Sequence, residues 1–194
     1  FGYLGIIPCS ISVNVIAGPR SSFQLTQYPG LNSSGGSVLS IQPILTFYDL
    51  GLNVANVANA TTSVVLLFSN GTQIMPTSGN LFGDLNVMSD GPVVTFQNIG
   101  IRTAALGYIL RFSSAMVPDV MHHPINVYPG VAHSMRIQNH PTEAFGAQVF
   151  VPQPEIWLLD LGDNIAVNNR DIVTVSILFT TNFQSRILGT RSVS

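Results

Sequence analysis

A repeated frame fixes the organisation of this chain before any single residue is considered. The stretch QPILTFYDLGLN at residues 42–53 returns as QPEIWLLDLGDN at residues 153–164, at an offset of 111 residues. Upstream of the frame the match continues at an offset of 112, from Gly18 on Gly130 to Pro29 on Pro141. Similarity at one fixed period is typical of a tandem array, in which each period is one structural unit.

The ends of the units repeat as well, and they predict the domain boundaries. FGYL at 1–4 is similar to LGYI at 106–109, and SVNVIAG at 12–18 is similar to PINVYPG at 124–130. We therefore predict three pieces of an array, and we expect the chain to be part of a longer polypeptide. The pieces are the end of a preceding unit at residues 1–18, a complete unit at 19–130, and the first half of a following unit at 131–194.

The local pattern within a unit predicts β-strands. Apolar residues alternate with period two, as in Thr62–Ser69, and Gly, Pro, Asn and Ser bound the runs. Seven short strands in about 111 residues fit an immunoglobulin-like β-sandwich, which typically has about 100 residues. The predicted fold class is all-β, with tandem immunoglobulin-like sandwiches. The predicted strands are 22–27, 38–48, 62–69, 84–88, 92–101, 106–113 and 124–128.

The frame resembles the tandem immunoglobulin-like repeats of large extracellular surface and fibre proteins. In those repeats a QP pair opens a strand that ends in Asp and is followed by Gly-x-Asn, here Gln42-Pro43, Asp49, Gly51 and Asn53. A later Gly-Tyr-x-Leu-x-Phe strand corresponds to residues 107–112. Such repeats occur in bacterial adhesin-like proteins and in the flagellar hairs, or mastigonemes, of protists and algae. The resemblance implies a structural segment of an extracellular filament or cell-surface fibre.

The composition limits the partners. Charged residues make up only 8 % of the chain, against about 25 % in an ordinary soluble protein. We expect glycans or neighbouring copies of the chain to cover its surface instead. The net charge of −2 gives no basic footprint for nucleic acid. No apolar run has the roughly 18 residues that a membrane span requires, so no membrane insertion is expected in this segment.

Three sequons are the candidate modification sites. Asn32, Asn59 and Asn70 each begin an Asn-x-Ser/Thr triplet, which accepts an N-linked glycan where a secreted chain exposes it. Each lies in a predicted loop or at a predicted strand end. We expect at least one to carry sugar if the chain passes through a eukaryotic secretory route.

The acidic turn of the third unit allows two interpretations. Asp160, Asp163 and Asn164 could bind calcium through oxygen atoms. The corresponding turn at 49–53 has no second carboxylate, and this favours a structural turn in which the Gly takes a positive φ and the Asn caps the backbone. We therefore expect no cofactor, with calcium as the alternative.

No catalytic constellation is found in the sequence, so we expect no enzyme and assign no catalytic residue. There is no Gly-x-Ser-x-Gly elbow, and the histidines lack the spacing of a zinc site. We expect them on the surface or in loops. They are His122, His123, His133 and His140. The single cysteine, Cys9, allows no disulfide within the chain.

One face of the strand before the acidic turn is the candidate interface. Glu155 shares a face with Trp157 and Leu159, and the first copy has Ile44 and Tyr48 on that face. A charged residue there predicts that the face looks outward. It could be covered by the unit's own loops, or it could contact a neighbouring unit or chain, because aromatic residues are enriched at interfaces. The alternative function is the stalk or binding module of an adhesin. In that case Trp157 and Tyr28 would meet a glycan or receptor.

Overall fold

The chain folds as an all-β protein in the computed structural model, which describes residues 10–55, 57, 59–143, 145–167, 170–176 and 192–193. Cys9 lies outside these residues. A 3-10 turn at Pro76–Ser78 is the single helical element described, and no described helix is long and apolar enough to cross a membrane. The strands are β1 (Ser22–Gln27), β2 (Asn32–Ser34), β3 (Ile44–Tyr48), β4 (Thr61–Leu67), β5 (Leu81–Phe82), β6 (Asn86–Met88), β7 (Val93–Thr95), β8 (Gly100–Ile101), β9 (Ala105–Ser114), β10 (Val120–Met121), β11 (Ile125–Tyr128), β12 (Ser134–Asn139), β13 (Glu155–Leu159), β14 (Val173–Thr174) and β15 (Ser192–Val193).

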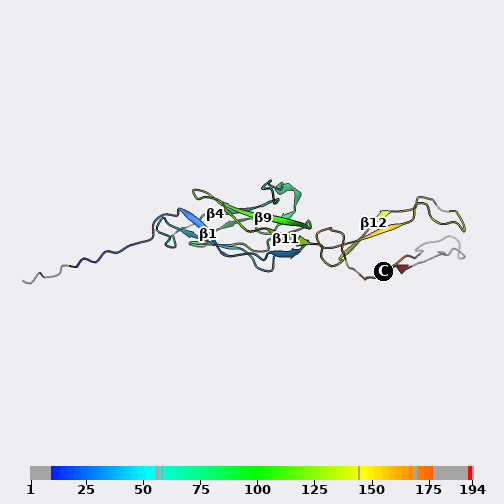
Figure 1. Ribbon diagram of the computed structural model, residues 1–194, viewed down its shortest axis with the longest axis horizontal. Coiled ribbons are helices and arrows are strands. Elements are labelled where there is room, and N and C mark those ends of the chain that lie inside the picture. The colour runs from blue at the N-terminus through cyan, green and yellow to red at the C-terminus, as the bar shows by residue number, and fades with distance from the viewer. Residues whose placement is uncertain are drawn as a thin grey trace, which may run out of the picture.

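Two sheets form a layered body from β1 to β11 (Figure 1). One sheet has the strand order β1-β3-β7, and the other has the order β2-β11-β9-β4-β6, with β10 added beside β9. Strand β2 runs parallel to β11, and the other pairings within these two sheets are antiparallel. Strands β5 and β8 form a further small sheet.

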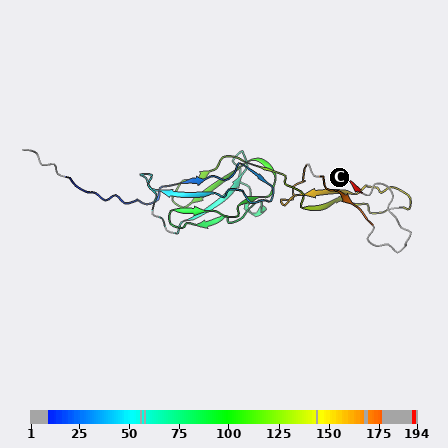
Figure 2. The same ribbon diagram turned by 90° about the horizontal axis from the view of Figure 1, so that it is seen from below.

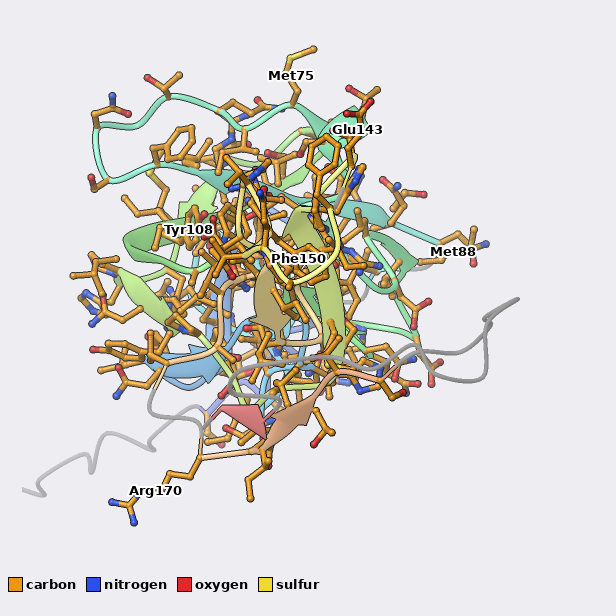
Figure 3. The ribbon with its side chains drawn as sticks, turned by 90° about the vertical axis from the view of Figure 1, so that its right-hand side faces the viewer. Met75, Met88, Tyr108, Glu143, Phe150 and Arg170 are labelled. Carbon is orange, nitrogen blue, oxygen red and sulfur yellow. The ribbon has the colours of Figure 1, made fainter. Side chains whose placement is uncertain are left out.

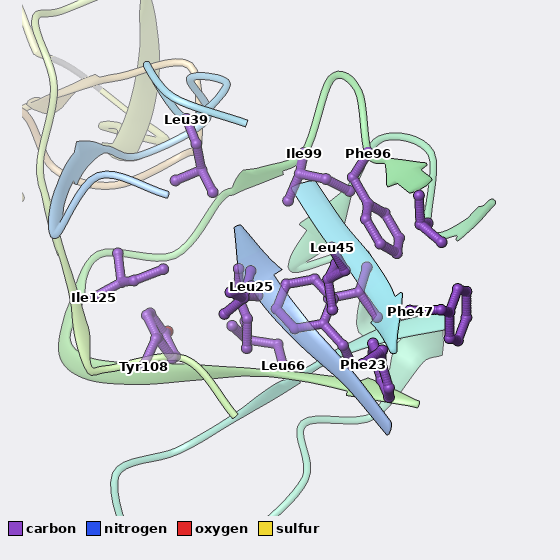
Figure 4. Packing of buried hydrophobic residues seen from close by; sticks show 14 of the residues in the cluster. Phe23, Leu25, Leu39, Leu45, Phe47, Leu66, Phe96, Ile99, Tyr108 and Ile125 are labelled. Atoms are coloured by element: carbon purple, nitrogen blue, oxygen red, sulfur yellow. The ribbon is translucent and has the colours of Figure 1, made fainter. Parts of the chain in front are cut away.

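A single apolar core lies between the two sheets (Figure 4). Alternation places every second residue of β9 inward, so Tyr108, Leu110 and Phe112 are buried there. Phe47 comes from the opposite sheet, and Phe96 packs on Phe112 with ring centroids 5.3 Å apart. Burial of each large apolar side chain contributes roughly 1.5–3 kcal/mol, so this core holds the two layers together.

The predicted strands agree with the structure where alternation is regular and are wrong where a side chain replaces the backbone. The range 22–27 is β1 itself, but the strand expected at 38–48 begins only at Ile44. The Gln42 side chain takes the role of a strand residue instead, because its Nε2 donates to the Ile99 carbonyl at 3.2 Å and its Oε1 accepts from the Ile99 N–H at 2.8 Å. The range predicted at 92–101 likewise divides into β7 and β8.

The hairpin β12–β13 reproduces β1–β3. Ser22 pairs with Tyr48 as Ser134 pairs with Leu159, and both hairpins shift register at the same point, after Leu25 and after Ile137. The β12–β13 hairpin lies beyond one end of the two-sheet body, and residues 10–20 leave the body at its opposite end (Figures 1 and 2). The repeat found in the sequence is therefore a repeat of strand pairing as well.

The two hairpins differ in what covers their apolar face. Phe23 of β1 is 2 % exposed, whereas Met135, at the matching position of β12, is 67 % exposed. Phe23 belongs to the core that also contains Val64 of β4 and Tyr108 of β9. Within the described part of the chain, the face of β12–β13 has no such second layer.

Candidate functional site: a clasp between the two-sheet body and the next hairpin

The acidic turn closes around one carboxylate. Asp160 follows β13, and its Oδ1 accepts the backbone N–H groups of Gly162 at 2.7 Å and Asn164 at 2.9 Å. The Asn164 side-chain amide donates to both carboxylate oxygens at 3.0 Å. Oδ2 also accepts the backbone N–H of Gly130 at 2.7 Å. We call these four residues the clasp, because they tie the segment between β11 and β12 to the end of β13.

The complete unit contains the same clasp. Asp49 follows β3, and its Oδ2 accepts the N–H of Gly18 at 2.8 Å. Its Oδ1 accepts the N–H groups of Gly51 and Asn53, both at 2.9 Å, and the Asn53 side chain donates to both oxygens at 3.2 Å. The Asp-x-Gly-x-Asn frame and the linker glycine are therefore one device, and each part of it is present twice.

Hydrogen bonding lowers the pKa of both clasp carboxyls. For Asp49 the strongest cause is the bond from the Gly18 N–H, followed by that from Asn53. For Asp160 burial alone would raise the pKa, and the bonds from Gly130, Asn164 and Gly162 outweigh it. Donors that favour the charged form hold each pKa below the ordinary value of 3.8.

One side chain of the clasp also reaches across to the two-sheet body. The Nδ2 of Asn164 donates to the Arg102 carbonyl at 2.7 Å, and its Oδ1 accepts the Ala104 N–H at 2.7 Å. Both partners are backbone groups in the loop between β8 and β9. These two bonds fix the turn against the end of the body, and we call this contact the joint.

Glycine makes the close approach at the joint possible. Gly36 has a φ of +75°, and a Cβ on it would collide with the Leu161 carbonyl group and the Gly162 nitrogen. A Cβ on Gly162 would collide with the Arg102 carbonyl and lie 2.8 Å from the Gly36 nitrogen. Gly35 is similarly enclosed, between Asn164 and Arg102. The joint thus packs backbone against backbone, which leaves no space for side chains.

The positive φ angle lies at a different residue of the turn than expected. Positive φ occurs at Leu52, with 61°, and at Asp163, with 64°. Neither Gly51 nor Gly162 adopts it, so the expectation that the glycine of the frame would do so is wrong. The physical need for glycine there is room beside the Asp and Asn side chains, since a Cβ on Gly51 would lie 2.9 Å from the Asn53 Nδ2.

The calcium candidates are occupied in other ways. The Asp160 oxygens point at N–H donors, an arrangement that satisfies a carboxylate without a cation. Asp163 faces the Arg136 guanidinium at 3.6 Å on the surface. Among the described residues, no group of three or more His, Cys, Asp or Glu side chains is placed to hold a metal ion.

The three sequon asparagines are all exposed. Asn32 begins the edge strand β2, and Asn59 lies in the loop before β4. The Oδ1 of Asn70 accepts the Thr72 N–H at 2.9 Å in a turn after β4. Each site is open to modification, and its occupancy stays a prediction.

The expected interface face is less open than predicted. Leu159 is only 2 % exposed, so its expected position on a surface is wrong. Its carbonyl accepts the His133 N–H at 2.7 Å, which encloses it beside the linker. Ile44, Tyr48 and Trp157 are half-buried, and the Trp157 indole donates to Glu155 at 2.8 Å.

His122 lies in the loop between β10 and β11, within the expectation of a surface or loop position, but it is buried with 4 % exposed. Its ring lies 6.0 Å from that of Tyr28, and neither ring nitrogen has a hydrogen-bond partner within the described structure. Burial lowers the pKa of His122 below the ordinary 6.5, and an interaction with the backbone of His123 opposes this. His123, His133 and His140 are exposed, as expected.

The sequence marks Asp160 and Asn164 as candidate site residues, but it does not show that Asn164 contacts the backbone of Arg102 and Ala104. The signal that could have found the joint is the repetition of a linker glycine with the Asp-x-Gly-x-Asn frame, because two elements that repeat together act together. A scan of known protein families finds no model that matches the chain, and a search of curated proteins finds no match.

Proposed function

We propose that this chain is a structural segment of an extracellular filament or cell-surface fibre, built from tandem immunoglobulin-like units. The observation that carries the proposal is the joint, where Asn164 bridges two successive units through the Arg102 carbonyl and the Ala104 N–H. A chain of units joined in this way keeps a fixed direction from one unit to the next. Such a chain transmits tension and length, which a fibre requires.

The strand order supports an immunoglobulin-like unit. In the variable-type sandwich, strands A, B and E pair in one sheet and strands G, F, C and C′ in the other. The orders β1-β3-β7 and β11-β9-β4-β6 correspond to these two sheets. The antibody disulfide has no counterpart here, so Phe23, Phe47, Phe96 and Phe112 supply the centre of the core.

The linker supports a stiff connection. A flexible linker would need several unbound residues, but Gly130 donates to Asp160 and His133 to Leu159. Pro129 restricts the backbone between them. Two inter-unit hydrogen bonds contribute about 1–3 kcal/mol together, in addition to the packing of the glycine backbones.

The surface supports contacts between neighbouring chains. Met75 and Met88 project from the body (Figure 3) and are well exposed, and charge is sparse over the whole chain. Methionine is enriched and charge is depleted at protein–protein interfaces, so these side chains fit contacts between chains. Glycans at the exposed sequons would shield the surface that association leaves open. Both features fit a self-associating extracellular protein.

An adhesin stalk is the second candidate function. The exposed ring of Tyr28 favours it, because aromatic side chains stack on sugars and contribute to interfaces. A stalk would use the same stiff joints, and it would remain a single rod. The two functions therefore differ in lateral association.

Electron microscopy of the native material tests the proposal. We expect ordered filaments in which many chains lie side by side, with an axial repeat equal to the length of one unit. Isolated rods that stay apart at high protein concentration would refute the fibre function. Glycan-array binding by those rods, abolished by Tyr28→Ala, would then establish the adhesin alternative.

A further inference from the structure

In the clasp at residues 49–53, the side-chain oxygen of Asn53 is not used for a hydrogen bond to another element. Asn164 uses its amide for the clasp and for the joint, whereas Asn53 makes only the clasp bonds to Asp49. Among the residues that the structure describes, no group donates to the Asn53 Oδ1. The two turns are otherwise alike, since the Asp49 N–H donates to the Asn53 carbonyl as that of Asp160 does to Asn164, both at 2.9 Å.

The surface around Asn53 is open where its counterpart is covered. Leu50 is 93 % exposed, and the corresponding Leu161 is 51 % exposed because the Gly36 loop lies against it. A Cβ on Gly51 would meet only side-chain atoms of its own turn. An apolar side chain, an unused amide oxygen and an uncovered glycine thus form one patch, at residues 49–53.

We infer that residues 49–53 are the docking surface for a further unit of the same kind, which would seat its Gly35-Gly36 loop and its Arg102 and Ala104 backbone against this turn. The occupant is identified by the joint itself, because the same turn already receives these groups at residues 160–164. Gly18 holds the linker at Asp49 as Gly130 does at Asp160, so the connection arrives at the matching position. This inference rests on the proposed function. It names the contact that would set the direction of one unit relative to the next in the fibre.

The test uses the chain with residues 1–18 replaced by a second copy of residues 19–130, so that Gly130 of the copy takes the place of Gly18. Amide hydrogen exchange reports on Ala104 in the copy and on Ala104 in the original unit. We expect the two amides to be protected to a similar degree. Asn53→Ala and, separately, Gly51→Ala are then made in the original unit only. Each should accelerate exchange at the copied Ala104 by about 5–150-fold, as expected for loss of 1–3 kcal/mol, and leave exchange at the original Ala104 unchanged.

Protection of the copied Leu110 amide, in the core strand β9, shows that the copy is folded. Rapid exchange at the copied Ala104 in a folded copy would overturn the inference, and so would protection that neither variant changes. Asn164→Ala is the matched control, since it should release only the original Ala104. Filaments in the native material would leave the fibre function standing even if this docking fails. Docking in a protein whose native material forms no filaments would refute the fibre function and leave the docking surface standing.

Discussion

A methyl group placed at Gly162 should open the joint, while the same group at Gly51 should not. In Gly162→Ala the new Cβ would collide with the Arg102 carbonyl and crowd the Gly36 nitrogen, both across the joint. In Gly51→Ala the Cβ would meet the Asn53 Nδ2 at 2.9 Å and the Asp49 Oδ1 at 3.4 Å, all within one turn. The strain inside the turn is common to both variants, so their difference isolates the joint.

The expected magnitude follows from the bonds that the collision breaks. Moving the turn away from Arg102 removes the two bonds of Asn164, each 2.7 Å long. Each contributes about 0.5–1.5 kcal/mol net, so the joint should weaken by about 1–3 kcal/mol. That change corresponds to a rise of about 5–150-fold in the open population.

Amide hydrogen exchange at Ala104 measures this opening directly, because its N–H donates to Asn164 and local opening governs exchange. We expect exchange at Ala104 to accelerate in Gly162→Ala and to stay unchanged in Gly51→Ala, with the β9 core amides protected in both. Equal exchange at Ala104 in both variants would refute the reasoning that backbone approach, and not turn geometry, requires glycine at 162.

Three further perturbations test the core, the clasp and the buried histidine. Phe47→Ala should lower the free energy of unfolding in urea by about 3–5 kcal/mol, because Phe47 is fully buried, and Phe68→Ala, at a more exposed ring, should cost much less. The folded pKa of Asp160 is depressed, so its contribution is present above the ordinary value of 3.8 and is lost as the pH falls through the folded pKa. The protection factor of the Ala104 amide should therefore fall as the pH drops below 3.8, and a protection factor that does not change with pH would argue against a role for the charged carboxylate. The folded pKa of His122 is also depressed, and because the protonated ring is the disfavoured form, stability should fall as the pH drops below 6.5. His122→Phe should reduce that loss in urea unfolding between pH 7 and pH 5, His123→Phe should preserve it, and equal effects of both would contradict the burial argument.

The sequence predicts this fold well where one residue's environment depends on its own strand. Alternation in β1 and β9 places Phe23 and Leu110 inward, and the structure agrees. It fails where packing between elements decides the outcome. Gln42 pairs with the backbone of Ile99, 57 positions away. His122 is buried beside Tyr28, which directly follows β1. No local pattern signals either contact.

The candidate site shows the same division in a sharper form. The Asp-x-Gly-x-Asn frame predicts Asp160 and Asn164 as site residues, because the sequence specifies the chemistry of their side chains. Arg102 and Ala104 take part through a carbonyl and an N–H, and every residue except proline offers both groups. Their role could be found only in three dimensions.

This use of backbone atoms has a consequence for how such an array can change. The surface that receives the turn consists of main-chain groups at Arg102 and Ala104 and of two glycines. A substitution other than proline at Arg102 or Ala104 alters the side chain and keeps the backbone group, so neighbouring units of the proposed array could diverge in sequence and still fit. In the proposed array, units could then be duplicated, lost or reordered without matching mutations at each boundary, and the length of the array would be independent of the sequence of its members.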